Sequence, residues 1–407
     1  MLDSSKTNKF KIVNDPVHGF IRLPNDLVFD VIQHPYFQRL RRISQTGLTQ
    51  MVYPGARHSR LHHALGCLYL MQNAVATLRA KNVPISADEE TGVYLAILLH
   101  DLGHGPFSHS LEHSIIEDTK HEEISLVLMQ ELNRVFNGSL TTAIRIFKGE
   151  YPKKFLKQLV SSQLDIDRLD YLKRDSFYTG VVEGNINPDR IISMMTVHEN
   201  ELVYEAKGLY SIEKFLMARM FMYWQVYMHK TSFTAEQILI QTLRRAKDLV
   251  RRGEKLFATS AMTYFLEHQK TNFAENPHAI AMFTQLDDHD VMSSIKEWTN
   301  HSDEILRILC LMLVDRKLPK AIVMNQPIQR AYLDREQKRI EDKFGVEDAS
   351  YLMGYNTLDV LPYDPYISPI KIIDKNGSMK EITQVEHQLV SLYLSRESKR
   401  YHFYSVS

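Results

Sequence analysis

A histidine and an aspartate, His100 and Asp101, directly follow an apolar run over residues 94–99. Adjacent residues on a helix point about 100° apart, so the two side chains can share one ion only if it lies beside the flank of the helix. Two ligand-type side chains at the end of an apolar helix are costly unless they are coordinated or paired. Taken alone, the pair fits an ordinary helix end equally well, with the histidine at the negative end of the helix dipole.

Further ligand-type side chains stand in helical segments on both sides of this pair. One histidine of the pair His62 and His63, together with Asp167, completes a set of two imidazoles and two carboxylates. Such a donor set suits one divalent ion, Mn²⁺, Fe²⁺, Mg²⁺ or Zn²⁺. Helical bundles commonly build metal sites from facing helices. Periodicity alone does not choose between the two neighbouring histidines, because both stand near the edge of an apolar face.

The composition is that of a globular protein with a sizeable core. The chain has 407 residues, of which 44% are apolar, and it carries 49 basic and 49 acidic residues, so no global field favours a nucleic acid or a membrane. Cys67 and Cys310 fall in apolar helical patterns, which argues against a disulfide scaffold or a cysteine zinc site. Since no apolar run reaches spanning length and the start lacks a signal core, we expect a soluble, cytoplasmic protein.

Helical periodicity from residue 27 to residue 314 predicts a mainly α fold. A short hairpin is expected over residues 10–23 and a second over residues 370–382, each with turn residues at its centre. We therefore expect an N-terminal hairpin and helix over residues 1–50, a helical catalytic core over 51–315 and a small mixed α/β region over 316–407.

Local signals predict where individual helices begin and end. Ser86 with Glu89, and Thr119 with Glu122, form the pattern of a capping box at a helix start. A single long helix is expected from about Ser211 to beyond residue 227. Residues 155–176 also show helical periodicity.

Several strings around these residues together resemble the HD-domain deoxynucleoside triphosphate (dNTP) triphosphohydrolases, a dGTPase-like family. They are the strings at residues 14–19, 35–41, 60–66, 99–109 and 165–171. The resemblance covers roughly the first 230 residues. It implies an HD-domain helical core, one divalent metal ion and hydrolysis of dNTPs to deoxynucleoside and triphosphate. It also implies that His63, rather than His62, joins His100, Asp101 and Asp167 as a metal ligand.

This reaction needs an activated water at the α-phosphorus and a proton for the departing 5′-oxygen. His104, His109 and His121 are the candidate acids, and Glu112 shares a helix face with His109. The resemblance implies His109 as the general acid and Glu112 as its orienting partner, at a position where relatives often carry aspartate. The alternative is that these histidines lie in a solvated loop.

Basic and aromatic residues are the candidates for substrate binding. Arg60 precedes His63 by three residues and so shares its helix face, while Arg168 follows Asp167 directly. A stripe at helical spacing comprises Arg219, Tyr223, Tyr227 and Lys230; such a stripe is more often a half-buried core face.

The resemblance gives these residues particular roles. It implies that Arg219 contacts the γ-phosphate and that Tyr227 stacks on the sugar. Tyr171 and Asp175 resemble residues that close on the deoxyribose, and Gln45 resembles a glutamine that reads the 3′-hydroxyl.

Some members of the family bind activating nucleotides at subunit interfaces and work as tetramers. Gln33 stands where guanine-reading members carry an aspartate, and an amide does not accept two hydrogen bonds from a guanine edge as a carboxylate does. We therefore expect a homo-oligomer, a tetramer or a dimer, whose activation is not strictly guanine-dependent. The candidate allosteric residues are Lys11, Asn14, Gln33, Gln38, Arg41, Arg316 and Lys320, the last two being alternatively part of an exposed charged turn.

Two other functions stay open at this point. An HD phosphohydrolase could act on an alarmone, a cyclic nucleotide or a nucleoside monophosphate. A nucleotide-sensing or nucleic-acid-binding module could bind without turnover. The stripe from Arg219 and the helix face from Asp167 to Asp175 favour dNTPs, and a complete ligand set with a histidine acid argues against a sensor.

Overall fold

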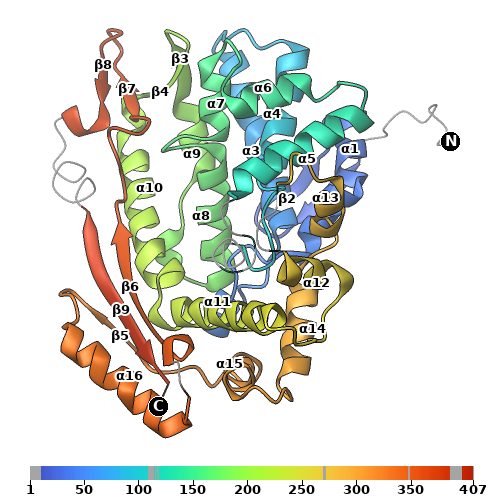
Figure 1. Cartoon of the computed structure of the whole chain (residues 1–407). Helices are drawn as coiled ribbons and strands as arrows, with labels where there is room; N and C mark the ends of the chain where they lie inside the picture. The colour runs from blue at the N-terminus through green and yellow to red at the C-terminus, as the bar shows by residue number, and fades with distance from the viewer. Residues whose placement is uncertain are drawn as a thin grey trace.

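The computed structural model describes residues 11–108, 114, 116, 119–268, 272–346, 349–385 and 397–406. It is mainly α, as predicted, with small sheets at its edges (Figure 1). The helices are α1 (Asp26–Gln33), α2 (Pro35–Gln38), α3 (Arg60–Ala80), α4 (Ala87–Leu99), α5 (His121–Val135), α6 (Thr141–Lys148), α7 (Lys154–Val160), α8 (Ile166–Thr179), α9 (Pro188–Met194), α10 (Leu209–Met222), α11 (Lys230–Arg251), α12 (Ser260–Glu267), α13 (Pro277–Phe283), α14 (Asp288–Trp298), α15 (Glu304–Val314) and α16 (Arg330–Phe344).

In the part of the chain that the structure describes, three small sheets accompany the helices. Their strands are β1 (Ile12–Asp15), β2 (Gly19–Arg22), β3 (Met195–His198), β4 (Glu201–Glu205), β5 (Ala321–Met324), β6 (Met353–Val360), β7 (Lys371–Ile373), β8 (Met379–Glu381) and β9 (Ser398–Ser405). The sheet orders are β1-β2, β3-β4-β7-β8 and β5-β9-β6. The two predicted hairpins are β1-β2 and β7-β8. Because β7 pairs in parallel with β4, the second hairpin continues a sheet that begins in the helical core.

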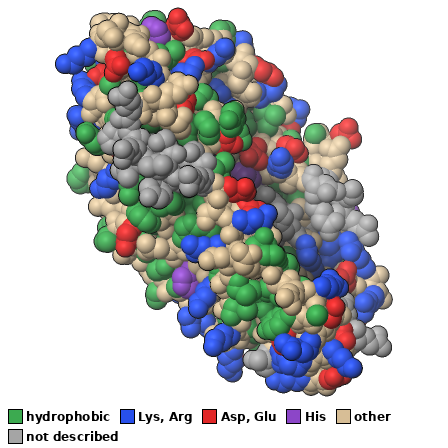
Figure 2. All heavy atoms as spheres, turned by 90° about the vertical axis from the view of Figure 1, so that its left-hand side faces the viewer, with side chains coloured by type: hydrophobic (Ala, Val, Ile, Leu, Met, Phe, Trp, Pro, Cys, Tyr) green, Lys and Arg blue, Asp and Glu red, His purple; other side chains and the backbone are tan. Residues whose placement is uncertain are grey.

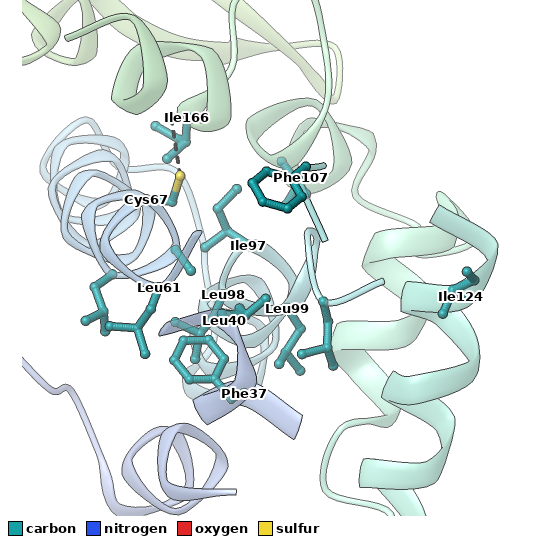
Figure 3. Packing of buried hydrophobic residues seen from close by; sticks show 14 of the residues in the cluster. Phe37, Leu40, Leu61, Cys67, Ile97, Leu98, Leu99, Phe107, Ile124 and Ile166 are labelled. Atoms are coloured by element: carbon teal, nitrogen blue, oxygen red, sulfur yellow. Dashed lines mark hydrogen bonds between the residues drawn. The ribbon is translucent and has the colours of Figure 1, made fainter. Parts of the chain in front are cut away.

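Helix α3 packs against both α4 and α8. The packing around them is apolar: Figure 3 shows side chains of α2, of the turn after it and of α3 near the C-terminal turn of α4. Leu40, Leu98 and Leu99 in this cluster are fully buried. The predicted capping box of Ser86 and Glu89 begins α4. The core thus fixes the end of α4, where the His-Asp pair lies.

One expectation about a helix start was wrong. Lys120, rather than Thr119, is the N-cap of α5, and its side chain makes no capping hydrogen bond, so the expected capping box with Glu122 is absent. The helical periodicity over residues 155–176 is confirmed: the segment forms two helices, α7 and α8, and Asp165 caps the second.

The predicted long helix beyond Tyr227 was also wrong. After α10 the chain forms a π-helical turn over Tyr223–Tyr227, in which the Met228 N–H donates to the Tyr223 carbonyl at 2.7 Å. The wider turn rotates the following side chains relative to α10, and the helix then ends. His229 caps a new helix, α11, so Lys230 belongs to a different helix from Arg219.

Figure 2 shows one face of the molecule. Lys and Arg side chains are more numerous at the lower end of this face, where α16 lies, than at its upper end. The helix also carries acidic residues between its basic ones, and Arg330 pairs with Asp334 at 2.9 Å. This surface is therefore of mixed charge. Within the described residues, no helix combines the length and the apolar character that crossing a membrane would require.

Candidate metal and nucleotide site

The structure brings the four predicted metal ligands together where α3, α4 and α8 meet. His63 lies in the first turn of α3, His100 and Asp101 follow α4, and Asp167 lies in the first turn of α8. Nε2 of His63 lies 3.0 Å from Oδ1 of Asp167 and 3.8 Å from Oδ2 of Asp101. Nε2 of His100 lies 3.5 Å from the same Asp167 oxygen. Two ligand atoms about 2.1 Å from one ion at a right angle are about 3.0 Å apart, so these separations suit a shared ion.

Hydrogen bonds fix which imidazole nitrogens face the centre. Nδ1 of His100 lies 2.6 Å from the Ile97 carbonyl, which can only accept, so Nδ1 carries the proton. Nε2 of neutral His100 then presents a lone pair; it is buried and makes no hydrogen bond with any described residue. A lone pair 3.3 Å from an Asp101 oxygen is repelled unless a proton or a metal ion lies between them. Although burial opposes protonation, the two nearby carboxylates raise the pKa of His100, which shows how strongly this point favours a positive charge. These residues therefore fit a divalent ion.

The neighbouring His62 takes a different position. Its Nδ1 accepts from the Ser59 N–H at 3.1 Å and completes a capping box at the start of α3. This contact turns His62 away from the ligand cluster and leaves the buried His63 to face Asp167. The placement agrees with the ligand that the family resemblance implies.

The charge of Asp101 is balanced by Arg60, with which it forms an ion pair. Although burial opposes ionisation, Arg60 and His100 hold the pKa of Asp101 well below its usual range. Ser108 accepts a second hydrogen bond from Arg60 at 2.7 Å. Arg60 is thus held beside the ligand cluster, where a cationic guanidinium can meet a phosphate group.

Of the candidate acids, His104 and His121 stack with ring centroids 3.8 Å apart. Nε2 of His104 lies 3.3 Å from Oδ1 of Asp101. Burial and the nearby Arg60 lower the pKa of His104 well below its usual value, so its ring is neutral at pH 7. A neutral ring suits hydrogen bonding to water better than proton donation. His109 and Glu112 lie outside the described residues.

Three predicted sugar contacts lie together beside α8, farther toward its C-terminus than the ligand Asp167. Oδ2 of Asp175 accepts from the Tyr227 hydroxyl at 2.7 Å, and the rings of Tyr171 and Tyr227 lie 6.2 Å apart. The other Asp175 oxygen lies 2.7 Å from Nε2 of the buried His58. Gln45 presents a buried Oε1 that has no hydrogen-bond partner among the described residues. These groups offer donors and acceptors to a polar ligand.

The predicted phosphate contacts occupy a neighbouring region. Arg168 donates to the Ser162 carbonyl at 2.9 Å. Arg219 donates to Gln163 at 3.1 Å and lies over the Tyr223 ring. Both guanidiniums keep further N–H groups for an anion.

A separate cavity of about 400 Å³ lies beside the N-terminal hairpin. Four predicted allosteric residues line it, Lys11, Asn14, Gln33 and Arg41, and His62 lines it as well. Gln38 accepts from Arg41 at 2.6 Å, next to the cavity. Arg316 instead donates to the Met51 carbonyl at 2.7 Å, and neither it nor Lys320 lines the cavity.

Sequence reasoning assigned no role to four buried residues that contact the site. Oδ2 of Asp170 lies 2.8 Å from Nδ1 of His63, and His18 contacts the other Asp170 oxygen at 2.7 Å. Cys67 places its sulfur 3.6 Å from His63, and His58 contacts Asp175. Asp170 stands three residues after Asp167, a helical spacing that could have indicated it.

Two family models match the chain: an HD domain over residues 60–175 and an HD associated region over residues 186–259. The Bacillus subtilis (strain 168) protein YwfO is 33% identical over 94% of this chain and 89% of its own length. A phosphohydrolase from Bacteroides thetaiotaomicron has the same fold with a TM-score of 0.94 and 47% identity, covering 98% of this chain and all of that one, 100%.

The deoxynucleoside triphosphate triphosphohydrolase SAMHD1 homolog of Dictyostelium discoideum is also similar. It is 28% identical over 62% of this chain, and the match covers 53% of its own length. The chain thus spans about half of that relative.

Proposed function

The chain belongs to the HD-domain family of phosphohydrolases, and we propose that it hydrolyses dNTPs to deoxynucleoside and triphosphate. A divalent ion held by His63, His100, Asp101 and Asp167 would polarise a phosphate oxygen and lower the pKa of a bound water. His109 would give the 5′-oxygen its proton, with Glu112 as its orienting partner. His104 and His121 would hold water near the ligand cluster. Gln45, Tyr171, Asp175 and Tyr227 would bind the deoxyribose.

The observation that supports this proposal best is the distance between the Asp175 carboxylate and the predicted metal ligand Asp167. Asp167 and Asp175 lie on one helix, α8, eight residues apart and therefore about 12 Å along its axis. A hydroxyl-binding carboxylate at that distance leaves room for a sugar between itself and an α-phosphate at the ion. Arg60, Arg168, Arg219 and Tyr223 would then surround the triphosphate.

The test is incubation of the purified protein with each dNTP and Mn²⁺, Mg²⁺, Fe²⁺ or Zn²⁺ in turn, followed by chromatography of the products. Deoxynucleoside and intact triphosphate in equal amounts are expected. Release of monophosphate and pyrophosphate would contradict the proposed bond cleavage. Turnover only of an alarmone, cyclic nucleotide or nucleoside monophosphate would replace this substrate class by another. Binding of dNTPs without any product would favour the sensing module.

We also propose that the cavity beside the hairpin binds an activating nucleotide, with Lys11 and Arg41 facing its phosphates. Two cationic side chains beside the amides of Asn14 and Gln33 offer donors in a space of about 400 Å³. GTP, dGTP, dATP and dTTP are titrated separately against hydrolysis of a fixed dNTP, with light scattering to follow assembly. Activation by several of them and a tetramer or dimer are expected. Strong activation by GTP alone would contradict the inference from Gln33.

A further inference from the structure

Two segments of the candidate site are joined by a residue far away in the sequence. Asp288, the first residue of α14, accepts from the Phe107 N–H through Oδ1 at 2.8 Å and from the Ser44 N–H through Oδ2, also at 2.8 Å. Its carboxyl group is largely buried. One carboxylate therefore sets the distance between the segment that carries Gln45 and the segment that follows His104.

The two segments also contact each other. Ser108 donates to the Ser44 carbonyl at 2.9 Å and accepts from Arg60 at 2.7 Å. Phe107 and Ser108 have φ values of 50° and 61°, a left-handed conformation that is uncommon for residues other than glycine. Such backbone persists only where its surroundings hold it. The bonds to Asp288, Ser44 and Arg60 are among the contacts that hold it here.

A second link runs in parallel with the first. The guanidinium of Arg39 donates to the Leu286 carbonyl at 2.8 Å and to the His104 carbonyl at 2.9 Å. Its side chain lies over the Phe283 ring and is almost completely buried. The region from Phe283 to Asp288 thus contacts the segment from His104 to Phe107 both through Arg39 and through Asp288. This region lies outside both residue ranges that the family models match.

We propose that Asp288 and Arg39 are positioning residues that set Gln45 and Thr46 against the segment Gly105–Ser108, and thereby determine how strongly the site prefers deoxyribose to ribose. This inference rests on the proposed dNTP hydrolysis. Within the described residues, Oε1 of Gln45 and Oγ1 of Thr46 are buried without a hydrogen-bond partner. Unpaired polar atoms discriminate between ligands only while their positions are fixed, because a shift of about 1 Å can cost two orders of magnitude in rate.

The variant Asp288→Asn tests the proposal. Its amide keeps one acceptor, but its NH₂ group would face the second backbone N–H, so one of the two bonds is lost. The ratio of kcat/KM for a dNTP to kcat/KM for the matching ribonucleotide is expected to fall by about tenfold. This ratio does not depend on the fraction of folded protein, so a loss of stability alone leaves it unchanged. Hydrogen exchange should also rise in peptides containing residues 44–46 and 105–108.

Asp287→Asn is the matched control. Asp287 is the N-cap of α14 and pairs with Arg42, but it contacts neither segment, and asparagine is an equally good N-cap. Its selectivity and exchange should equal those of the wild type. If Asp288→Asn does not fold, Arg39→Lys replaces it, because lysine cannot bridge two carbonyls with a planar fork.

The outcomes separate this inference from the proposed function. A wild-type protein that hydrolyses no nucleoside triphosphate overturns the proposed function, while the exchange measurement still decides whether Asp288 holds the two segments. A wild-type dNTPase whose Asp288→Asn variant keeps both its selectivity and its exchange pattern overturns the positioning role.

Discussion

Nδ1 of His63 lies 2.8 Å from Oδ2 of Asp170, and both side chains are completely buried. The carboxylate can only accept, so it fixes the proton on Nδ1 and turns Nε2 toward Asp167. Arg174 donates to Asp170 at 2.8 Å and to Asp15 at 2.8 Å, which ties the N-terminal hairpin to the ligand cluster. Partners of this kind orient a metal ligand and raise its basicity.

We predict that Asp170→Asn weakens Mn²⁺ binding by about 10–100-fold, because the amide no longer fixes the proton of His63. Isothermal titration of the metal-stripped protein with Mn²⁺ measures the effect. Asp165→Asn is the control, since Asp165 caps the same helix through the Arg168 N–H at 2.8 Å and asparagine keeps that cap. Equal affinity in both variants would contradict the orienting role.

The ligand cluster itself is tested by Asp101→Ala. The substitution removes one ligand and leaves Arg60 without its ion-pair partner. We expect bound metal and turnover to be lost together while the circular dichroism spectrum is unchanged, because α3, α4 and α8 are held by their apolar contacts. Metal content is measured by mass spectrometry after dialysis. A variant that retains a full equivalent of metal would refute the assignment.

The sugar side of the site is tested at His58. His58 stacks on Tyr178 at 4.4 Å between ring centroids and contacts Asp175 at 2.7 Å. We expect His58→Phe, which keeps the stack but loses the bond, to raise KM for dNTPs about tenfold, as loss of a hydrogen bond to a charged group does. Tyr178→Phe serves as control and should leave KM unaltered. An unchanged KM in His58→Phe would mean that Asp175 needs no orienting partner.

Parts of the fold and of the site followed from local sequence signals. The helical periodicity of apolar residues predicted the helical core. The pattern of Ser86 and Glu89 predicted the start of α4, and the turn residues predicted both hairpins. The histidines and aspartates stood out because an apolar helix seldom ends in two ligand-type residues. The structure brings them within hydrogen-bonding or ionic distance of one another.

Other features depend on contacts that periodicity does not contain. Arg219, Tyr223 and Tyr227 do lie next to one another as the stripe predicts, but a π-helical turn ends the helix after Tyr227, so the separation of Lys230 from the stripe could not be predicted from a 3.6-residue repeat. Asp288 contacts Phe107 across 181 positions of sequence, and a single aspartate at a helix start predicts only a favourable charge on the helix dipole. The hydrogen bonds of Asp288 to Phe107 and Ser44 form only once the chain has folded.

A buried carboxyl group near the same segments predicts that the free energy of unfolding depends on pH. Glu236 of α11 lies over Gly47, where an added Cβ atom would be 2.9 Å from its Oε1. Burial raises the pKa of Glu236 to about 8. In the unfolded chain a glutamate ionises near pH 4.3, so between about pH 4.3 and 8 the folded state holds a proton that the unfolded state has released. The free energy of unfolding therefore falls as the pH rises through this window.

We predict that Glu236→Gln removes this dependence. Glutamine is neutral in both states, so its melting temperature should decline less than that of the wild type between pH 5 and pH 8, and the gap between the two proteins should widen toward pH 8. Differential scanning calorimetry at several pH values measures the melting temperatures of both proteins. Glu123→Gln is the control, because Glu123 is an exposed residue in the first turn of α5 and should follow the wild-type curve. Parallel curves for the wild type and Glu236→Gln would show that Glu236 ionises alike in the folded and unfolded chain.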